Sequence, residues 1–131
     1  MSFQCTVVTP EQQILDETVT QVILPAHDGQ MGILTGRAPV LVKLGAGALR
    51  ADLAGGQSRT WFVDGGIAQM TGDKLTILTD EATPASEIDA ETARAEYAEA
   101  LARIPTDDRT KKDRDRAMQR ARAKQLLAGA R

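Results

Sequence analysis

Residues 67–79 read IAQMTGDKLTILT and carry the pattern on which the fold depends. Two runs rich in apolar and β-branched side chains, Ile67–Thr71 and Lys74–Thr79, flank the dipeptide Gly72-Asp73. This dipeptide is typical of a two-residue hairpin turn, because glycine adopts positive φ at little cost. The alternation within Lys74–Thr79 is imperfect, which indicates a strand packed partly on both faces. The stretch therefore predicts two strands joined by a tight turn.

The same pattern extends toward the N-terminus. Ten of the eleven glycines lie before Asp73, where they separate short β-rich runs. The expected strands are Phe3–Val8, Thr18–Leu24, Met31–Leu34, Val40–Leu44, Ala48–Leu53, Arg59–Val63, Ile67–Thr71 and Lys74–Thr79. The expected turns include Thr9-Pro10, Gly45-Ala46-Gly47, Gly55-Gly56 and Asp64-Gly65-Gly66. Many short strands with frequent turns predict a β-sandwich or barrel over residues 1–84.

After Thr83-Pro84 the apolar period lengthens to that of a helix. Ser86-Glu87-Ile88-Asp89 fits a capping box, in which Ser86 accepts a hydrogen bond from the backbone of Asp89. Pro105 ends this helix, and Thr106-Asp107-Asp108 can cap a second one, roughly Arg109 to Leu127. The expected apolar positions are Ala90, Ala93, Tyr97, Ala100, Leu101 and Ile104, then Ala117, Met118, Ala121 and Gln125 or Ala128. A short connection predicts an antiparallel α-helical hairpin over residues 85–131.

Charge divides the chain in the same place. Residues 86–108 carry seven acidic side chains and two arginines, whereas residues 109–131 carry nine Lys or Arg against two Asp. An acidic helix beside a basic one makes the hairpin electrostatically self-complementary. Residues 86–131 contain only seven apolar side chains larger than Ala. We therefore expect the hairpin to be marginally stable unless it docks on another surface.

Composition excludes several classes of function. The chain has 131 residues, with one cysteine, Cys5, and one histidine, His27. These counts rule out an internal disulfide framework and a Cys- or His-based metal site, so we expect no catalytic residue, metal or cofactor. Cys5 lies in an alternating strand and is expected to be a small core residue. The apolar runs are far shorter than the ~20 residues that cross a bilayer.

The basic run Arg109–Lys124 admits three interpretations. It could be a solvated helix face, a surface that docks on an acidic protein, or a contact for nucleic acid phosphates. Aromatics make up only 3% of the chain, and an acidic helix lies beside the run. Both facts argue against nucleic acid and favour a protein partner. One hypothesis is therefore a β-sandwich adaptor that binds another protein through its charged hairpin.

Several short segments occur in an order that is typical of one family. They are Val7-Val8-Thr9-Pro10-Glu11, Val22-Ile23-Leu24-Pro25, Asp28-Gly29-Gln30-Met31-Gly32-Ile33-Leu34, Arg37-Ala38-Pro39-Val40-Leu41 and Asp64-Gly65-Gly66-Ile67. Together they resemble the epsilon subunit of the F-type proton-translocating ATP synthase. The resemblance covers nearly the whole chain, but Arg37 stands where the family usually has histidine. Any role attached to that histidine is therefore in doubt here.

The resemblance implies a non-catalytic protein in which a β-sandwich of about ten strands is followed by two helices. It implies attachment to the gamma subunit in the rotating central stalk, and contact with the ring of c subunits. The residues implied at the c-ring are His27, Asp28, Gly29, Gln30, Met31 and Gly32. In this interpretation Gly29 and Gly32 let backbone approach backbone, while Asp28 and Gln30 supply polar contacts.

The resemblance also implies that the C-terminal helices extend into the catalytic head and restrain ATP hydrolysis. The arginines implied in this inhibition are Arg114, Arg116, Arg120 and Arg122. The family's ATP-binding pattern, Ile/Leu-Asp-x-x-Arg-Ala, is matched by Ile88, Asp89 and Ala93 but has Thr92 in place of arginine. Losing a charge-assisted phosphate contact costs roughly 1.5–3 kcal/mol, so we expect ATP to bind weakly or not at all.

Location follows from the same resemblance. Met1 leads directly into the first expected strand, with no basic segment and no long apolar segment of a secretion signal. We therefore expect a peripheral protein at the cytoplasmic face of a bacterial plasma membrane, or at the stroma-facing thylakoid surface if the gene belongs to an organelle. Membrane association is expected only through the complex, and no nucleic acid is expected as a partner.

Overall fold

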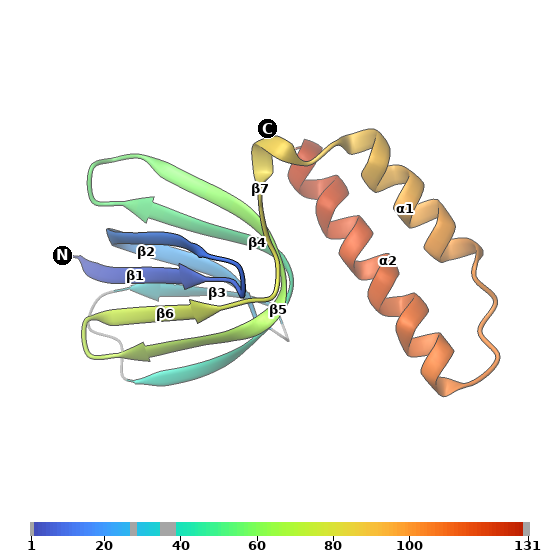
Figure 1. Ribbon diagram of the computed structural model, residues 1–131, viewed down its shortest axis with the longest axis horizontal. Coiled ribbons are helices and arrows are strands. Elements are labelled where there is room, and N and C mark those ends of the chain that lie inside the picture. The colour runs from blue at the N-terminus through green and yellow to red at the C-terminus, as the bar shows by residue number, and fades with distance from the viewer. Residues whose placement is uncertain (1, 27–28, 35–38, 130–131) are drawn as a thin grey trace. The chain divides into compact units, whose positions relative to one another are not determined.

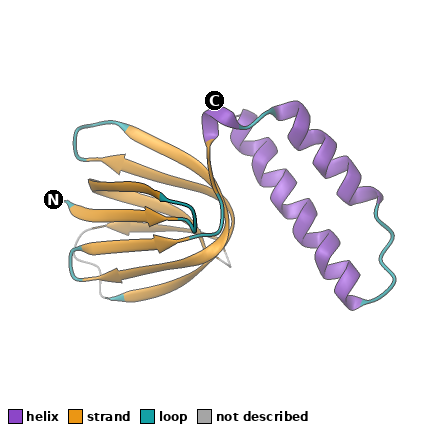
Figure 2. Cartoon of the chain, viewed as in Figure 1, coloured by secondary structure: helices purple, strands orange, loops and turns teal. Residues whose placement is uncertain are grey.

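A computed structural model describes residues 2–26, 29–34 and 39–129. The chain divides into two compact units, Met1–Thr83 and Pro84–Arg131. Strands build the first unit and helices the second (Figures 1 and 2). The predicted class, a β-sandwich followed by an α-helical hairpin, is confirmed by this architecture.

The first unit is one sheet that closes on itself. Its strands are β1 (Phe3–Val8), β2 (Gln13–Ala26), β3 (Gly29–Leu34), β4 (Val40–Leu53), β5 (Ser58–Thr71), β6 (Lys74–Leu78) and β7 (Ala82–Pro84). The order is β1-β6-β5-β4-β2-β3, and β7 pairs with β5. The sheet closes because β1 pairs in parallel with β6 and antiparallel with β2. The two curved layers enclose a common interior (Figure 1).

The described residues form seven strands rather than about ten. Val40–Leu44 and Ala48–Leu53, expected as separate strands, are continuous in β4, and the turn expected at Gly45-Ala46-Gly47 is absent from these described residues. In the same way β5 runs through Asp64-Gly65-Gly66. Both glycine clusters mark close contacts within long strands rather than reversals. A Cβ on Gly47 would lie 2.8 Å from Pro25 Cβ, so glycine is needed there without a turn.

Buried apolar side chains from all the long strands fill the interior. Among the largest are Leu24, Ile33, Leu49, Met70, Leu75 and Ile77. Cys5 is also fully buried, as predicted for a small core residue. Burial, and after it the negative charge of Asp16, raises the pKa of the Cys5 thiol to about 12. The thiol therefore stays protonated at neutral pH and is unreactive.

The second unit begins differently from the prediction. Ser86 lies in a short 3-10 helix, η1 (Ala85–Glu87), and does not cap α1 (Ala90–Ala102). The cap is Asp89, whose carboxylate accepts a hydrogen bond from the backbone N–H of Thr92. The capping box at Ser86 was therefore wrong, because Asp is an equally strong cap and stands directly before the helical run.

The second helix, α2 (Asp108–Gly129), lies antiparallel to α1 (Figure 1). Ala93 and Ala100 of α1 and Ala121 of α2 are fully buried, as their spacing predicted. Leu101 and Ile104, however, are 56% and 87% exposed. Ile104 lies beyond the helix, which ends at Ala102, because a residue that precedes proline is sterically disfavoured from the helical conformation.

Replacing Gly66 with Ala tests the close contact within β5. The added Cβ would lie 2.1 Å from the backbone oxygen of Leu78, and Gly66 has φ +118°. We expect G66A to lower the free energy of unfolding by about 2 kcal/mol or more, since strained φ alone costs of order 1–3 kcal/mol. Denaturant unfolding of the full chain measures this. The control is G55A, because a Cβ there meets nothing within 4 Å. Equal losses in the two variants would contradict the argument.

Candidate functional site

The segment expected to touch a c-ring falls partly on β3. His27 and Asp28 lie outside the described residues. Gly29–Gly32 form the start of β3, which pairs with β2 from Ala26↔Gly29 to Ile23↔Gly32. Gln30 and Gly32 are exposed, whereas Met31 packs against the core. Along the described residues β3 is therefore an edge strand that presents a polar side chain and an open backbone face to solvent.

The two glycines of this segment differ. Gly29 has φ +139°, a conformation that favours glycine. Gly32 has no such φ, and a Cβ there would meet only the Gln21 side-chain nitrogen, at 3.8 Å. The folded chain alone therefore accepts a side chain at position 32. A requirement for glycine there would have to come from a partner.

A surface that the sequence did not single out lies on β4, β5 and β6. We call Leu41, Ile67 and Leu78 the apolar patch; they are 67%, 41% and 44% exposed. Ile67 pairs directly with Leu78, and Lys43, two residues after Leu41, pairs with Ile67. Paired residues of neighbouring strands share a face, so the three side chains lie on one outer face. Beside them is a shallow hollow of about 260 Å³, lined in part by Val8, Pro10 and Asp80.

The imperfect alternation of Lys74–Thr79 was the available signal for this patch. This alternation predicts burial on both faces, yet Leu78 is exposed. An outward leucine and a doubly buried leucine look the same in a sequence. Exposed apolar side chains gathered on one face are typical of a protein-binding surface.

The four arginines implied in inhibition separate into two pairs. Arg116 and Arg122 are exposed. Arg114 and Arg120 are half-buried, and the Nε atom of each is inaccessible to solvent. Arg116 and Arg122 are therefore the more exposed pair in the folded hairpin.

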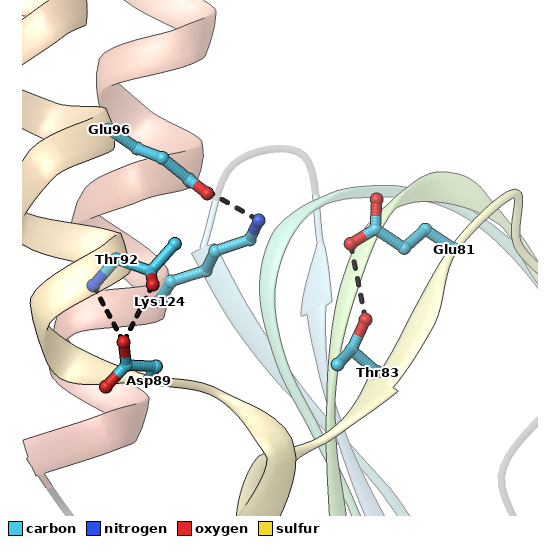
Figure 3. Close-up of polar contacts among 6 residues, drawn as sticks. All are labelled: Glu81, Thr83, Asp89, Thr92, Glu96 and Lys124. Carbon is cyan, nitrogen blue, oxygen red and sulfur yellow. Dashed lines mark hydrogen bonds and ion pairs between the residues drawn. The ribbon is translucent and has the colours of Figure 1, made fainter.

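An ion pair links the two helices. Lys124 Nζ of α2 lies 3.4 Å from Glu96 Oε2 of α1 (Figure 3). Near the connection, the pKa of Arg103 is raised first by its hydrogen bond with Glu99 and to a smaller degree by Asp113 of α2. This second attraction joins a base of the acidic helix to an acid of the basic helix. The expected attraction between an acidic α1 and a basic α2 is therefore accompanied by one attraction with the charges reversed.

The side chains that match the ATP-binding pattern are either buried or hydrogen-bonded to a neighbouring residue of this chain. Ile88 and Ala93 are buried. Asp89 Oδ2 accepts hydrogen bonds from Thr92 Oγ1 at 2.7 Å and from Thr92 N at 3.2 Å (Figure 3). Thr92, which replaces the pattern's arginine, therefore binds the aspartate of the same motif. This arrangement builds a helix cap and offers no cationic group to a phosphate.

Among residues 2–26, 29–34 and 39–129, no group of three or more His, Cys, Asp or Glu side chains could hold a metal ion. Within the same residues, no helix is long and apolar enough to cross a bilayer.

Comparisons with known proteins match both units. The family model for the β-sandwich domain of the ATP synthase delta/epsilon chain matches residues 2–85. The ATP synthase epsilon chain of Rhodopirellula baltica is 41% identical over 122 residues, which cover 93% of this chain and 94% of that protein. The epsilon chain of Microcystis aeruginosa is 37% identical, with 98% and 96% covered. This chain belongs to the ATP synthase epsilon-chain family.

A solved structure agrees with this membership. A chain of the Euglena gracilis mitochondrial ATP synthase, determined with its OSCP, F1 and c-ring, has a TM-score of 0.87 and 26% identity. The alignment covers 99% of this chain and 82% of that one. The resemblance drawn from the sequence is thus confirmed. As an ATP synthase epsilon chain, the protein is a subunit of an enzyme complex and associates with a membrane through that complex.

In this epsilon-family chain, the N-terminus of α2 is held by a carboxylate. Asp107 Oδ1 accepts a hydrogen bond from the backbone N–H of Thr110 at 2.8 Å. This backbone bond, and after it the bond from the Thr110 hydroxyl, lowers the pKa of Asp107 from its ordinary 3.8. A lowered native pKa means that the cap stabilises the fold above pH 3.8 and that this stabilisation is lost as pH falls through the native value.

Replacing Asp107 with Asn tests this cap. Asn caps helices well but does not titrate, so we expect D107N to keep α2 helical at every pH. The difference in melting temperature between native chain and D107N should be constant above about pH 5 and shift against the native chain as pH falls below 3.8. Circular dichroism of both proteins measures it. A difference that does not depend on pH would remove Asp107 from the acid response.

Proposed function

We propose that this chain is a non-catalytic subunit of the central stalk, bound to the gamma subunit through the apolar patch. The single observation that carries the proposal is the exposure of Leu41, Ile67 and Leu78 on one outer face of the sandwich. Fully burying a side chain of this size stabilises by roughly 1.5–3 kcal/mol. An apolar centre surrounded by polar residues is the usual build of a protein interface, and these three side chains fit such a centre.

The position of the patch supports a permanent partner. Ile67 directly follows Gly66, where β5 passes within contact distance of the Leu78 backbone. The patch is therefore built on paired strands rather than on loops. Strands in a closed sheet hold side chains in fixed positions, and little conformational entropy is lost when a partner binds. A subunit that transmits rotation needs such a contact.

The c-ring contact belongs, in this proposal, to the segment His27, Asp28, Gly29, Gln30, Met31 and Gly32. The described part begins the edge strand β3, with Gln30 exposed. A polar side chain and an unhindered backbone at Gly32 suit a close approach to a polar loop of a c subunit. Its described residues, Gly29–Gly32, lie on β3, whereas the apolar patch lies on β4, β5 and β6. One sandwich can thus contact gamma and the c-ring at the same time.

The hairpin is proposed to restrain ATP hydrolysis by contact with the catalytic head. Arg116 and Arg122 are exposed and can bind an acidic surface while Arg114 and Arg120 remain against the hairpin. The proposed location is the cytoplasmic face of a bacterial plasma membrane, or the stroma-facing thylakoid surface if the gene belongs to an organelle. The proposed chain acts without a catalytic residue or bound cofactor of its own.

Placing lysines in the apolar patch tests the gamma contact. We expect L41K and I67K each to raise the Kd for the purified gamma subunit at least tenfold, because each change removes apolar burial and adds a charge to be desolvated. Isothermal titration calorimetry measures the Kd. Q57K, on the exposed turn between β4 and β5, adds the same charge away from the patch. If Q57K weakens binding equally, or if L41K and I67K do not weaken it, the patch is not the gamma site.

Removing residues 85–131 tests the regulatory role. The truncated chain should assemble and couple normally while ATP hydrolysis by the membrane-bound complex rises. R116E combined with R122E should raise hydrolysis in the same way, and higher salt should weaken inhibition by the native chain. The matched control is R59E combined with K74E on the sandwich, which changes net charge equally. Unchanged hydrolysis after truncation, at any proton-motive force, would exclude an inhibitory hairpin.

A further inference from the structure

The hollow beside the apolar patch continues that patch along one row of paired residues. Ile67 of β5 pairs with Leu78 of β6, and Leu78 pairs in parallel with Val8 of β1. Residues paired across neighbouring strands share a face, so Val8 extends the outer apolar surface beyond Leu78. Both Val8 and Leu78 line the hollow. A partner that covers the apolar patch at Leu78 therefore reaches the hollow as well.

Two hydrogen-bonded segments make the lining of the hollow rigid. In the first, the Thr9 backbone N–H and the Thr9 hydroxyl donate to the Gln12 carbonyl, at 2.9 and 3.1 Å. In the second, the Thr79 backbone N–H donates to the Val8 carbonyl at 3.1 Å, which ties the end of β6 to the end of β1. The hollow is therefore preformed, and little conformational entropy is lost when a side chain fills it.

The lining combines apolar side chains with one carboxylate. Val8, Pro10 and Leu78 contribute apolar surface, and Asp80 contributes the acid. The two threonines that also line the hollow, Thr9 and Thr79, use their hydroxyls in hydrogen bonds to backbone carbonyls of this chain. The lining therefore suits a side chain that has an apolar stem and a charged end.

The charges near the hollow are mainly negative. Asp80 is exposed, and no described Lys or Arg side chain forms an ion pair with it. Two further acids, Glu11 and Glu81, directly follow lining residues in the sequence. Lys43, the base on the same outer row, lies on β4, two strands away from β6. This charge distribution favours a cation rather than an anion in the hollow.

We propose that the hollow receives one lysine or arginine side chain of the subunit that binds the apolar patch. The aliphatic stem packs against Val8, Pro10 and Leu78, as such stems commonly do on apolar surfaces. The cationic end pairs with Asp80, and the pair strengthens as the partner excludes water from it. The inference rests on the proposed gamma contact and adds the side-chain chemistry that positions gamma on the patch.

Isothermal titration calorimetry of the full chain with the purified gamma subunit tests the pair. We expect D80N to raise the Kd about tenfold and D80K about a hundredfold, because the first removes the attraction and the second replaces it with repulsion. D73N and D73K are the matched controls, since Asp73 is an exposed acid in the turn at the opposite end of β6. The controls should change the Kd by less than about twofold. Higher salt should weaken binding of the native chain more than binding of D80N.

A charge exchange tests whether a single side chain is responsible. Each lysine and arginine of gamma is changed to glutamate in turn, and each gamma variant is titrated against D80K. One variant should bind D80K about tenfold more tightly than native gamma does and should bind the native chain more weakly. If no gamma variant behaves in this way, no single basic side chain meets Asp80 and the inference is overturned.

The outcomes separate this inference from the gamma contact itself. Loss of binding in I67K without loss in D80N or D80K would overturn the basic side chain and leave the gamma contact standing. Equal losses in D80N and D73N would also overturn it, because net charge alone would then explain the effect. Unchanged binding in both I67K and D80K would overturn the gamma contact and the inference together.

Discussion

The sandwich depends on the close passage of β5 over the backbone of Leu78 and Thr79. Gly65 and Gly66 have φ of 81° and 118°, and β5 continues through both residues from Ser58 to Thr71. The Thr79 hydroxyl, itself buried, donates a hydrogen bond to the Gly65 carbonyl at 2.7 Å and fastens the crossing. Because β5 pairs with β4, β6 and β7, three strands depend on the course that it takes at this crossing. The crossing also places Ile67 directly beside Leu78, and both side chains belong to the apolar patch.

The sequence was sufficient for the class of fold but not for the continuity of its strands. Gly72-Asp73 between two β-rich runs has one physical outcome, a tight turn, and β5 and β6 are joined there. Gly45-Ala46-Gly47 and Asp64-Gly65-Gly66 have two outcomes. A glycine cluster permits either a reversal or a close contact, and only the partner decides between them. For Gly47 and Gly66 those partners are Pro25 and Leu78, which are distant in sequence.

Helix boundaries show a similar limit. Ser86 and Asp89 are both strong caps, three residues apart, and a sequence does not rank them. The fold selects Asp89, because Thr92 binds its carboxylate through both backbone and hydroxyl. Asp89 is also one of the residues that match the ATP-binding pattern, and Thr92 stands where that pattern has arginine. The departure at Thr92 was visible in the sequence, but its bond to Asp89 required the structure.

The two units differ in the size of the apolar side chains that they bury. Large apolar side chains fill the sandwich, and four of them, Leu34, Leu41, Ile67 and Leu78, are exposed on paired strands. Such a surface suits a long-lived partner. The hairpin buries alanines and leaves Leu101, Ile104 and Leu126 exposed, so its helices lose little when they separate and have apolar contacts to gain elsewhere. Arg114 adds a buried donor to that weak contact. A rigid binding surface and helices that separate readily place opposite demands on apolar burial. In this chain the closed sheet suits the first demand and the small-residue hairpin suits the second.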